Sequence, residues 1–128
     1  MRYLLDTHTF MWADSDPSRL SARVAAVISD PENTIFVSLV SIWEIQIKHQ
    51  LGKLPLAIPL SEIIERQQNE NALELLPITL PHILALAGLP SHHRDPFDRL
   101  LIAQAQAEQL TLISHDSILI QYSVQVLW

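Results

Sequence analysis

The sequence predicts an α/β fold in which a mostly parallel sheet is covered by helices on both faces. Two observations support this prediction. Short apolar runs with the character of buried strands recur along the 128 residues, and longer segments with apolar residues at helical spacing lie between them. Because parallel strands require crossover connections that are normally helical, the alternation predicts a three-layer α/β/α sandwich.

The first half of the chain supplies two strands and two helices. Arg2–Leu5 is expected to be a short buried strand, and Thr34–Val37 repeats its character. Ser21–Ser29 lies between them and has helical apolar spacing. A second helix is expected over Ser38–Leu51, where Gly52 is a typical helix stop.

The second half continues the alternation. In chain order, the expected elements are helix Ser61–Ala72, strand Leu73–Leu76, helix Leu80–Leu86, helix Asp95–Gln109, strand Thr111–Ile113 and strand Val124–Leu127. Pro55 and Pro59 interrupt the chain before the first of these helices, and Gly88 and Pro90 separate the last two. Five strands are therefore expected in all.

Residues 1–128 are expected to form one domain, because the length is usual for one domain and a hydrophobic content of 48% is sufficient for one core. The chain has no cysteine, so disulfides and thiolate metal sites are excluded. We find no signal-peptide pattern and no apolar run of membrane-spanning length, and we expect a cytoplasmic protein with no membrane association. The net charge of −6 argues against broad, nonspecific nucleic-acid binding, which depends on cationic contacts.

Four acidic residues lie at segment boundaries. Asp6 closes the first strand, Asp116 follows the fourth, and Glu44 and Asp98 lie near the starts of apolar-patterned helices. In a doubly wound sheet these positions share one edge, where ligands usually bind. Because the pattern offers only oxygen ligands, it suits Mg²⁺ or Mn²⁺ better than zinc.

Each acid also has a structural explanation. Asp6 and Asp116 can cap the helix or turn that follows, and Asp95 suits an N-cap with Pro96 in the first helical position. The segment Ser41–Glu44 has the spacing of a capping box, unless the helix already begins near Ser38. For Asp98 capping is a weaker explanation, because a first-turn acid gains only about 0.3–1 kcal/mol from the helix dipole.

Several segments together resemble the PIN-domain ribonucleases, specifically the VapC-like toxins of prokaryotic toxin–antitoxin pairs. The segments are Tyr3–Thr9, Ser41–Ile45, Leu51–Leu54, His93–Ala105 and Ser114–Asp116. The resemblance covers almost the whole chain, and His93–Ala105 is its most specific motif. It implies a five-stranded parallel sheet of order 3-2-1-4-5, Mg²⁺ or Mn²⁺ at the acidic edge, endonucleolytic cleavage of RNA, and an antitoxin partner.

Carried over by position, the resemblance makes Asp6, Glu44, Asp98 and Asp116 the catalytic and metal-binding residues. Thr7 and Ser114 match hydroxyl residues beside this quartet, and Arg94 and Arg99 are candidate phosphate contacts. The expected reaction is hydrolysis of an RNA phosphodiester bond by metal-activated water. The histidines show no zinc-helix spacing, and we assign His93 and His115 secondary roles.

Two other functions fit parts of the pattern. In a catalytically silent PIN-like binding module, the acids would only cap helices and an apolar surface would recruit protein. A haloacid-dehalogenase-like phosphatase would use Asp6 as its nucleophile, but His8 stands where that family places a second aspartate. Apolar side chains left outside the core could support a homodimer or antitoxin docking.

Overall fold

The computed structural model describes residues 1–128 and contains one five-stranded parallel sheet of order β3-β2-β1-β4-β5. The strands are β1 (Arg2–Leu5), β2 (Thr34–Ser38), β3 (Glu74–Leu76), β4 (Thr111–Ile113) and β5 (Val126–Leu127). In the central register, Leu4 lies opposite Phe36 of β2 and Leu112 of β4. The predicted fold class and strand order are confirmed.

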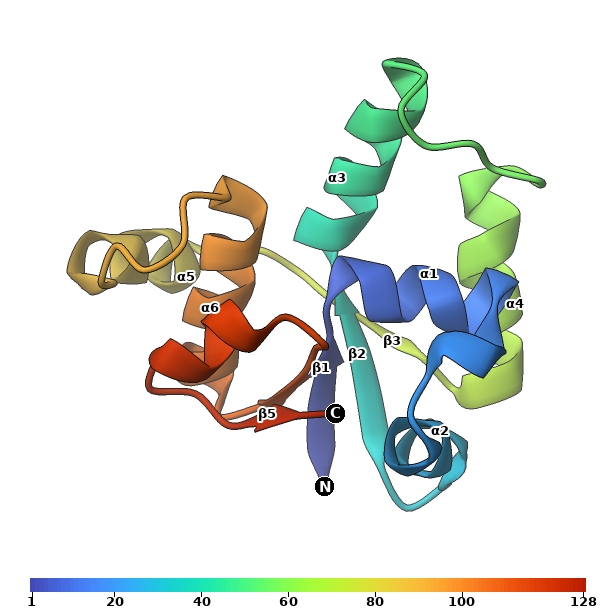
Figure 1. Cartoon of the computed structure of the whole chain (residues 1–128), viewed down its shortest axis with the longest axis horizontal. Coiled ribbons are helices and arrows are strands. Elements are labelled where there is room, and N and C mark those ends of the chain that lie inside the picture. The colour runs from blue at the N-terminus through green and yellow to red at the C-terminus, as the bar shows by residue number, and fades with distance from the viewer.

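Six α-helices connect the strands: α1 (Thr7–Ser15), α2 (Ala22–Ser29), α3 (Leu39–Gln50), α4 (Leu60–Asn71), α5 (Leu80–Ala85) and α6 (Pro96–Glu108). Short 3-10 helices occur at Pro17–Arg19 (η1), Leu86–Gly88 (η2) and Ser117–Gln121 (η3). In Figure 1, α5 and α6 lie on one side of β1 and β2, whereas α1, α2 and α4 lie on the other. This is the predicted three-layer arrangement.

Alternation along β1 produces the two halves of the core. Tyr3 and Leu5 point toward one face and pack with α1, α2, α3 and α4, while Leu4 points toward the opposite face and packs with α6 and η3. Leu4 and Leu5 are almost completely buried. A strand buried on both faces has no polar alternation, which explains why the sequence shows short continuous apolar runs.

Many element boundaries differ from the predicted ones by one or two residues. β3 begins at Glu74 instead of Leu73, and β5 is only Val126–Leu127. Element ends depend on where hydrogen-bonded pairing stops, which apolar composition alone does not specify. No helix in the structure combines the length and apolar character needed to cross a membrane.

Candidate metal centre

Asp6 and Asp116 both follow strands of the sheet, and both cap the helix that comes next. Asp6 lies immediately after β1, and its Oδ1 accepts a hydrogen bond of 2.8 Å from the backbone N–H of Thr9. Asp116 lies beyond β4, and its Oδ1 accepts one of 3.0 Å from Ile118 N–H. The capping explanation is therefore correct for both. Capping engages only one oxygen of each carboxylate, which leaves the second for another ligand.

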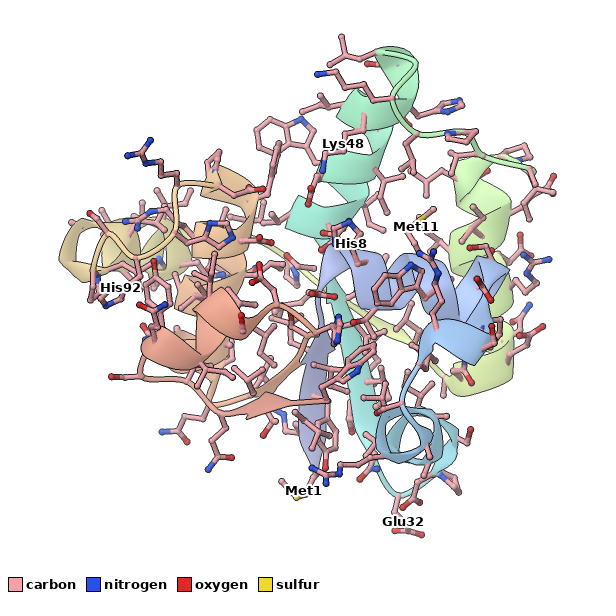
Figure 2. All side chains as sticks on the ribbon, in the orientation of Figure 1. Met1, His8, Met11, Glu32, Lys48 and His92 are labelled. Carbon is pink, nitrogen blue, oxygen red and sulfur yellow. The ribbon has the colours of Figure 1, made fainter.

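Glu44 does not cap a helix. Because α3 begins at Leu39, with Ser38 as its N-cap, Glu44 lies in the second turn and the capping-box alternative is wrong. Its side chain is almost fully buried, where it accepts a 2.7 Å hydrogen bond from the Thr7 hydroxyl and forms an ion pair with Lys48. The hydrogen bond with Glu44 raises the pKa of Lys48, so the lysine stays charged. Figure 2 shows Lys48 on α3 and His8 at the start of α1.

Asp98 lies in the first turn of α6. Asp95 is the N-cap and accepts from the backbone N–H groups of Phe97 and Asp98, and Pro96 takes the first helical position, as predicted. The Asp98 side chain is only 21% exposed. Its pKa is raised to about 6, first by burial and then by the nearby charge of Asp95.

The charges around Asp98 show that the other acids lie near it. Glu44 and Asp6 both raise the pKa of Asp98 further, while His93 opposes the rise. Four carboxylates thus lie at one edge of the sheet, and the closest group comprises His93, Asp98 and Asp116, whose possible ligand atoms lie within 4.8 Å of one another. Carboxylate oxygens are the donor set that suits a hard divalent ion.

His93 is a member of this group that sequence reasoning placed in a secondary role. Its Nε2 lies 2.8 Å from Asp98 Oδ2 and 3.5 Å from Asp116 Oδ2. The one feature of the sequence that could have identified His93 is its place in the same motif as Asp98, which lies five residues further along the chain. No periodic pattern identifies such a loop residue, because its position depends on tertiary contacts.

The hydroxyl residues and arginines have defined places. The buried Ser114 Oγ accepts from the backbone N–H of Asp116 and shapes the turn that carries this acid. The Thr7 hydroxyl donates a hydrogen bond to Glu44, and this bond links the segment that carries Asp6 to α3. The Arg99 guanidinium donates to the carbonyls of Leu89, Pro90 and His93, so it holds the loop before α6, whereas Arg94 is exposed.

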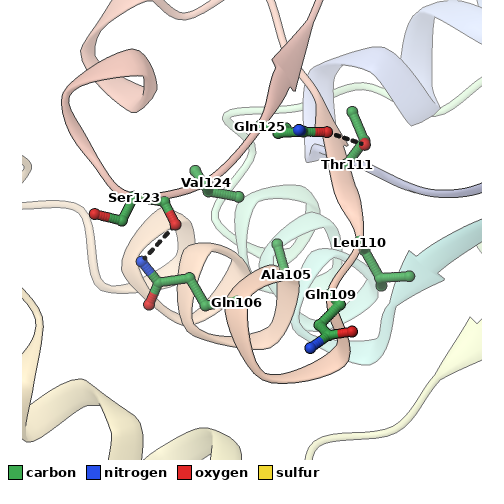
Figure 3. A pocket seen from close by; sticks show the side chains of 8 residues that line it. All are labelled: Ala105, Gln106, Gln109, Leu110, Thr111, Ser123, Val124 and Gln125. Atoms are coloured by element: carbon green, nitrogen blue, oxygen red, sulfur yellow. Dashed lines mark hydrogen bonds between the residues drawn. The ribbon is translucent and has the colours of Figure 1, made fainter.

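Two pockets differ in the chemistry of their linings. A pocket of about 280 Å³ beside the acids is lined by Asp6, His8, Trp12, His115 and Asp116. The pocket in Figure 3, of about 340 Å³, lies at the opposite end of β4. Its polar lining consists of glutamine, serine and threonine side chains without an ionisable group, so it offers neither a metal-binding carboxylate nor a general base.

Comparison with known proteins identifies the family of this chain. The sequence matches the PIN domain over residues 3–124. It is 31% identical over 115 residues to Ribonuclease VapC22 of Mycobacterium tuberculosis, with 88% of this chain and 85% of the relative covered. The chain therefore belongs to the PIN-domain family, in the branch of the VapC ribonucleases.

Solved structures share the fold at lower sequence identity. VapBC2 from Rickettsia felis, bound to a promoter DNA fragment, matches with a TM-score of 0.76 and 16% identity over 99% of this chain and 98% of that chain. A toxin–antitoxin complex from Klebsiella pneumoniae matches with a TM-score of 0.63 and 18% identity over 98% and 96%. These likenesses support the fold assignment.

Proposed function

We propose that this chain is a divalent-metal-dependent endoribonuclease and the toxin of a toxin–antitoxin pair. One observation carries the proposal: Asp98 and Asp116 both lie close to His93, at an edge of the sheet that also holds Asp6 and Glu44. A 31% identical relative named as a ribonuclease supports it. In this proposal residues 1–128 act as one domain in the cytoplasm.

The four acids have distinct roles in the proposed reaction. Asp6, Asp98 and Asp116 would hold Mg²⁺ or Mn²⁺, with Glu44 binding directly or through water. Such an ion, when bound, would supply a water nucleophile at neutral pH and would neutralise charge on the phosphate. Asp6 and Asp116 are held in place by the caps they form, and Lys48 and Thr7 orient Glu44.

A silent binding module remains the competing function. A binding module would account for Asp6 and Asp116, because both side chains cap helices. It gives no reason for a buried Glu44 outside the first turn of α3, or for the pKa of Asp98 being raised to about 6. A carboxylate with a perturbed pKa inside a cluster of acids is typical of functional sites. The phosphatase alternative is set aside because the chain belongs to another family.

We further propose an antitoxin and a second copy of the chain as protein partners. The Klebsiella pneumoniae neighbour is a toxin–antitoxin complex, and it supports the first partner by likeness of fold. Large apolar side chains are exposed on α3 and α5, including Trp43, Leu80 and Leu84, and these support association. Sedimentation of the antitoxin-free chain should give the mass of a dimer. A monomer throughout the micromolar range would contradict the homodimer.

The nuclease proposal is tested by incubating antitoxin-free protein with a pool of structured and single-stranded RNA. Internal cleavage is expected with Mg²⁺ or Mn²⁺ and none with EDTA. Asp98→Asn should lose this cleavage. Asp30→Asn is the matched control and should retain it, because Asp30 is an exposed acid beyond the end of α2, away from the acidic edge. Cleavage that persists in EDTA would contradict metal dependence. An uncut pool together with no binding of divalent ions would favour the binding module.

A further inference from the structure

His93 is held by contacts on its backbone and on its ring. Its backbone N–H donates to the Tyr122 hydroxyl at 2.7 Å, and its carbonyl accepts from Arg99 Nη1 at 3.3 Å. Tyr122 is buried, so this anchor lies within the core. On the ring, Nδ1 faces the backbone N–H of Asp95 at 3.3 Å. The imidazole therefore has a defined orientation before any ligand arrives.

The contact with Asp95 determines which ring nitrogen carries the proton. A backbone N–H can only donate, so Nδ1 of His93 acts as the acceptor. In the neutral ring the proton then lies on Nε2, the nitrogen that faces Asp98 Oδ2 at 2.8 Å and Asp116 Oδ2 at 3.5 Å. His93 thus presents an N–H donor to the two carboxylates.

This arrangement is opposite to that of a metal-ligating histidine. A ligating imidazole uses the lone pair of one nitrogen and donates the N–H of the other to a carboxylate, a carbonyl or water. Here the nitrogen near the carboxylates carries the proton, and the other faces a donor. Hydrogen bonds of this kind to ligating carboxylates fix their orientation, and they influence metal affinity from outside the ligand set.

We propose that His93 is a positioning residue for the candidate metal centre: its Nε2–H orients the Asp98 carboxylate toward Asp116 without binding the ion. The proposal rests on the metal dependence proposed above. One carboxylate oxygen of Asp98 accepts from His93, and the second is left for the cation. Arg99 and Tyr122 contribute indirectly, because they hold the His93 backbone.

The test measures Mn²⁺ affinity in the absence of RNA, by the loss of the free-ion paramagnetic resonance signal. His93→Leu should weaken binding by about 10–100-fold. His93→Gln retains an N–H donor on a side chain of similar reach, and its affinity should lie within a few-fold of the parent. Asp30→Asn is the control: Asp30 is exposed beyond the end of α2, away from the acidic edge, and its replacement should leave the affinity unchanged.

A second readout separates positioning from ligation. Electron spin-echo modulation of the bound Mn²⁺ should show no directly coordinated nitrogen in the parent protein. Nitrogen coupling that disappears in His93→Leu would make His93 a ligand and overturn the proposal. Unchanged affinity in His93→Leu, or equal losses in the Leu and Gln variants, would also overturn it, since neither result depends on the N–H donor.

The outcomes also distinguish this inference from the proposed nuclease. If the parent binds Mn²⁺ and the variants match it, only the role of His93 fails. A parent that binds no Mn²⁺ would remove both the metal-dependent nuclease and the positioning role. If His93→Leu does not fold, the comparison of His93→Gln with His93→Ala gives the same contrast between a retained and a lost donor.

Discussion

Replacing Asp98 by asparagine should lower metal-dependent RNA cleavage by about 10³-fold or more while making the metal-free protein more stable. The loss follows from removing a charged ligand, since metal stabilisation of the transition state is of the order of several kcal/mol. The gain in stability follows from burial: the carboxylate is only 21% exposed and lies among like charges, and an amide there carries no charge. The amide oxygen can still accept from His93.

The prediction is checked by single-turnover cleavage rates and by urea unfolding in EDTA at pH 7. We expect Asp98→Asn to increase the free energy of unfolding by about 1–2 kcal/mol. Asp30→Asn, at an exposed site, should change neither quantity appreciably. Loss of activity accompanied by loss of stability would indicate a structural acid instead of a metal ligand, and unchanged cleavage would remove Asp98 from the site.

The metal-free protein should lose stability between about pH 4 and pH 6 as Asp98 ionises. The pKa of this carboxyl is raised from its ordinary 3.8 to about 6, chiefly by burial. In that window the folded state binds more protons than the unfolded state, so this group makes the free energy of unfolding fall as pH rises. A difference of one pKa unit between the folded and unfolded states corresponds to about 1.4 kcal/mol of unfolding free energy. Because Asp98 keeps some contact with solvent, we expect its full shift to lower the free energy of unfolding by about 2 kcal/mol.

The check is a series of urea unfolding curves from pH 4 to pH 8 in EDTA, for the parent and for Asp98→Asn. Other carboxylates titrate in both proteins, so the difference between the two pH profiles isolates Asp98. The parent should lose stability relative to the variant up to about pH 6 and change little above it. Parallel profiles would contradict the raised pKa. Saturating Mg²⁺ should reverse the parent's loss, because the cation favours the ionised carboxylate.

Local sequence rules predicted much of this structure. The alternation of apolar runs and helical patterns predicted the α/β class, because a strand buried on both faces needs a continuous apolar segment, as Leu4 and Leu5 show. The start of α6 followed from the cap preference of Asp95 and the restricted backbone of Pro96. The strand order came from the resemblance to PIN domains and not from the local pattern.

Three features of the site depend on contacts between residues that are distant in the sequence, and local sequence rules did not predict them. Ser38 and Ser41 are both acceptable caps for the helix of Glu44, and the choice depends on β2, whose pairing with β3 extends to Ser38. The orientation of His93 depends on Tyr122, which lies 29 residues away. The raised pKa of Asp98 requires burial and the combined charges of Asp95, Glu44 and Asp6. A single sequence does not reveal these distances.

Anomalous scattering from crystals soaked in Mn²⁺ can show whether the carboxylates of Asp98 and Asp116 share a divalent ion, as we propose. We expect a single strong anomalous peak, or a close pair, within coordination distance of both carboxylates and beside Asp6, and no peak in Asp98→Asn crystals. An edge without a peak at saturating Mn²⁺, or the same peak in the asparagine variant, would contradict the proposal.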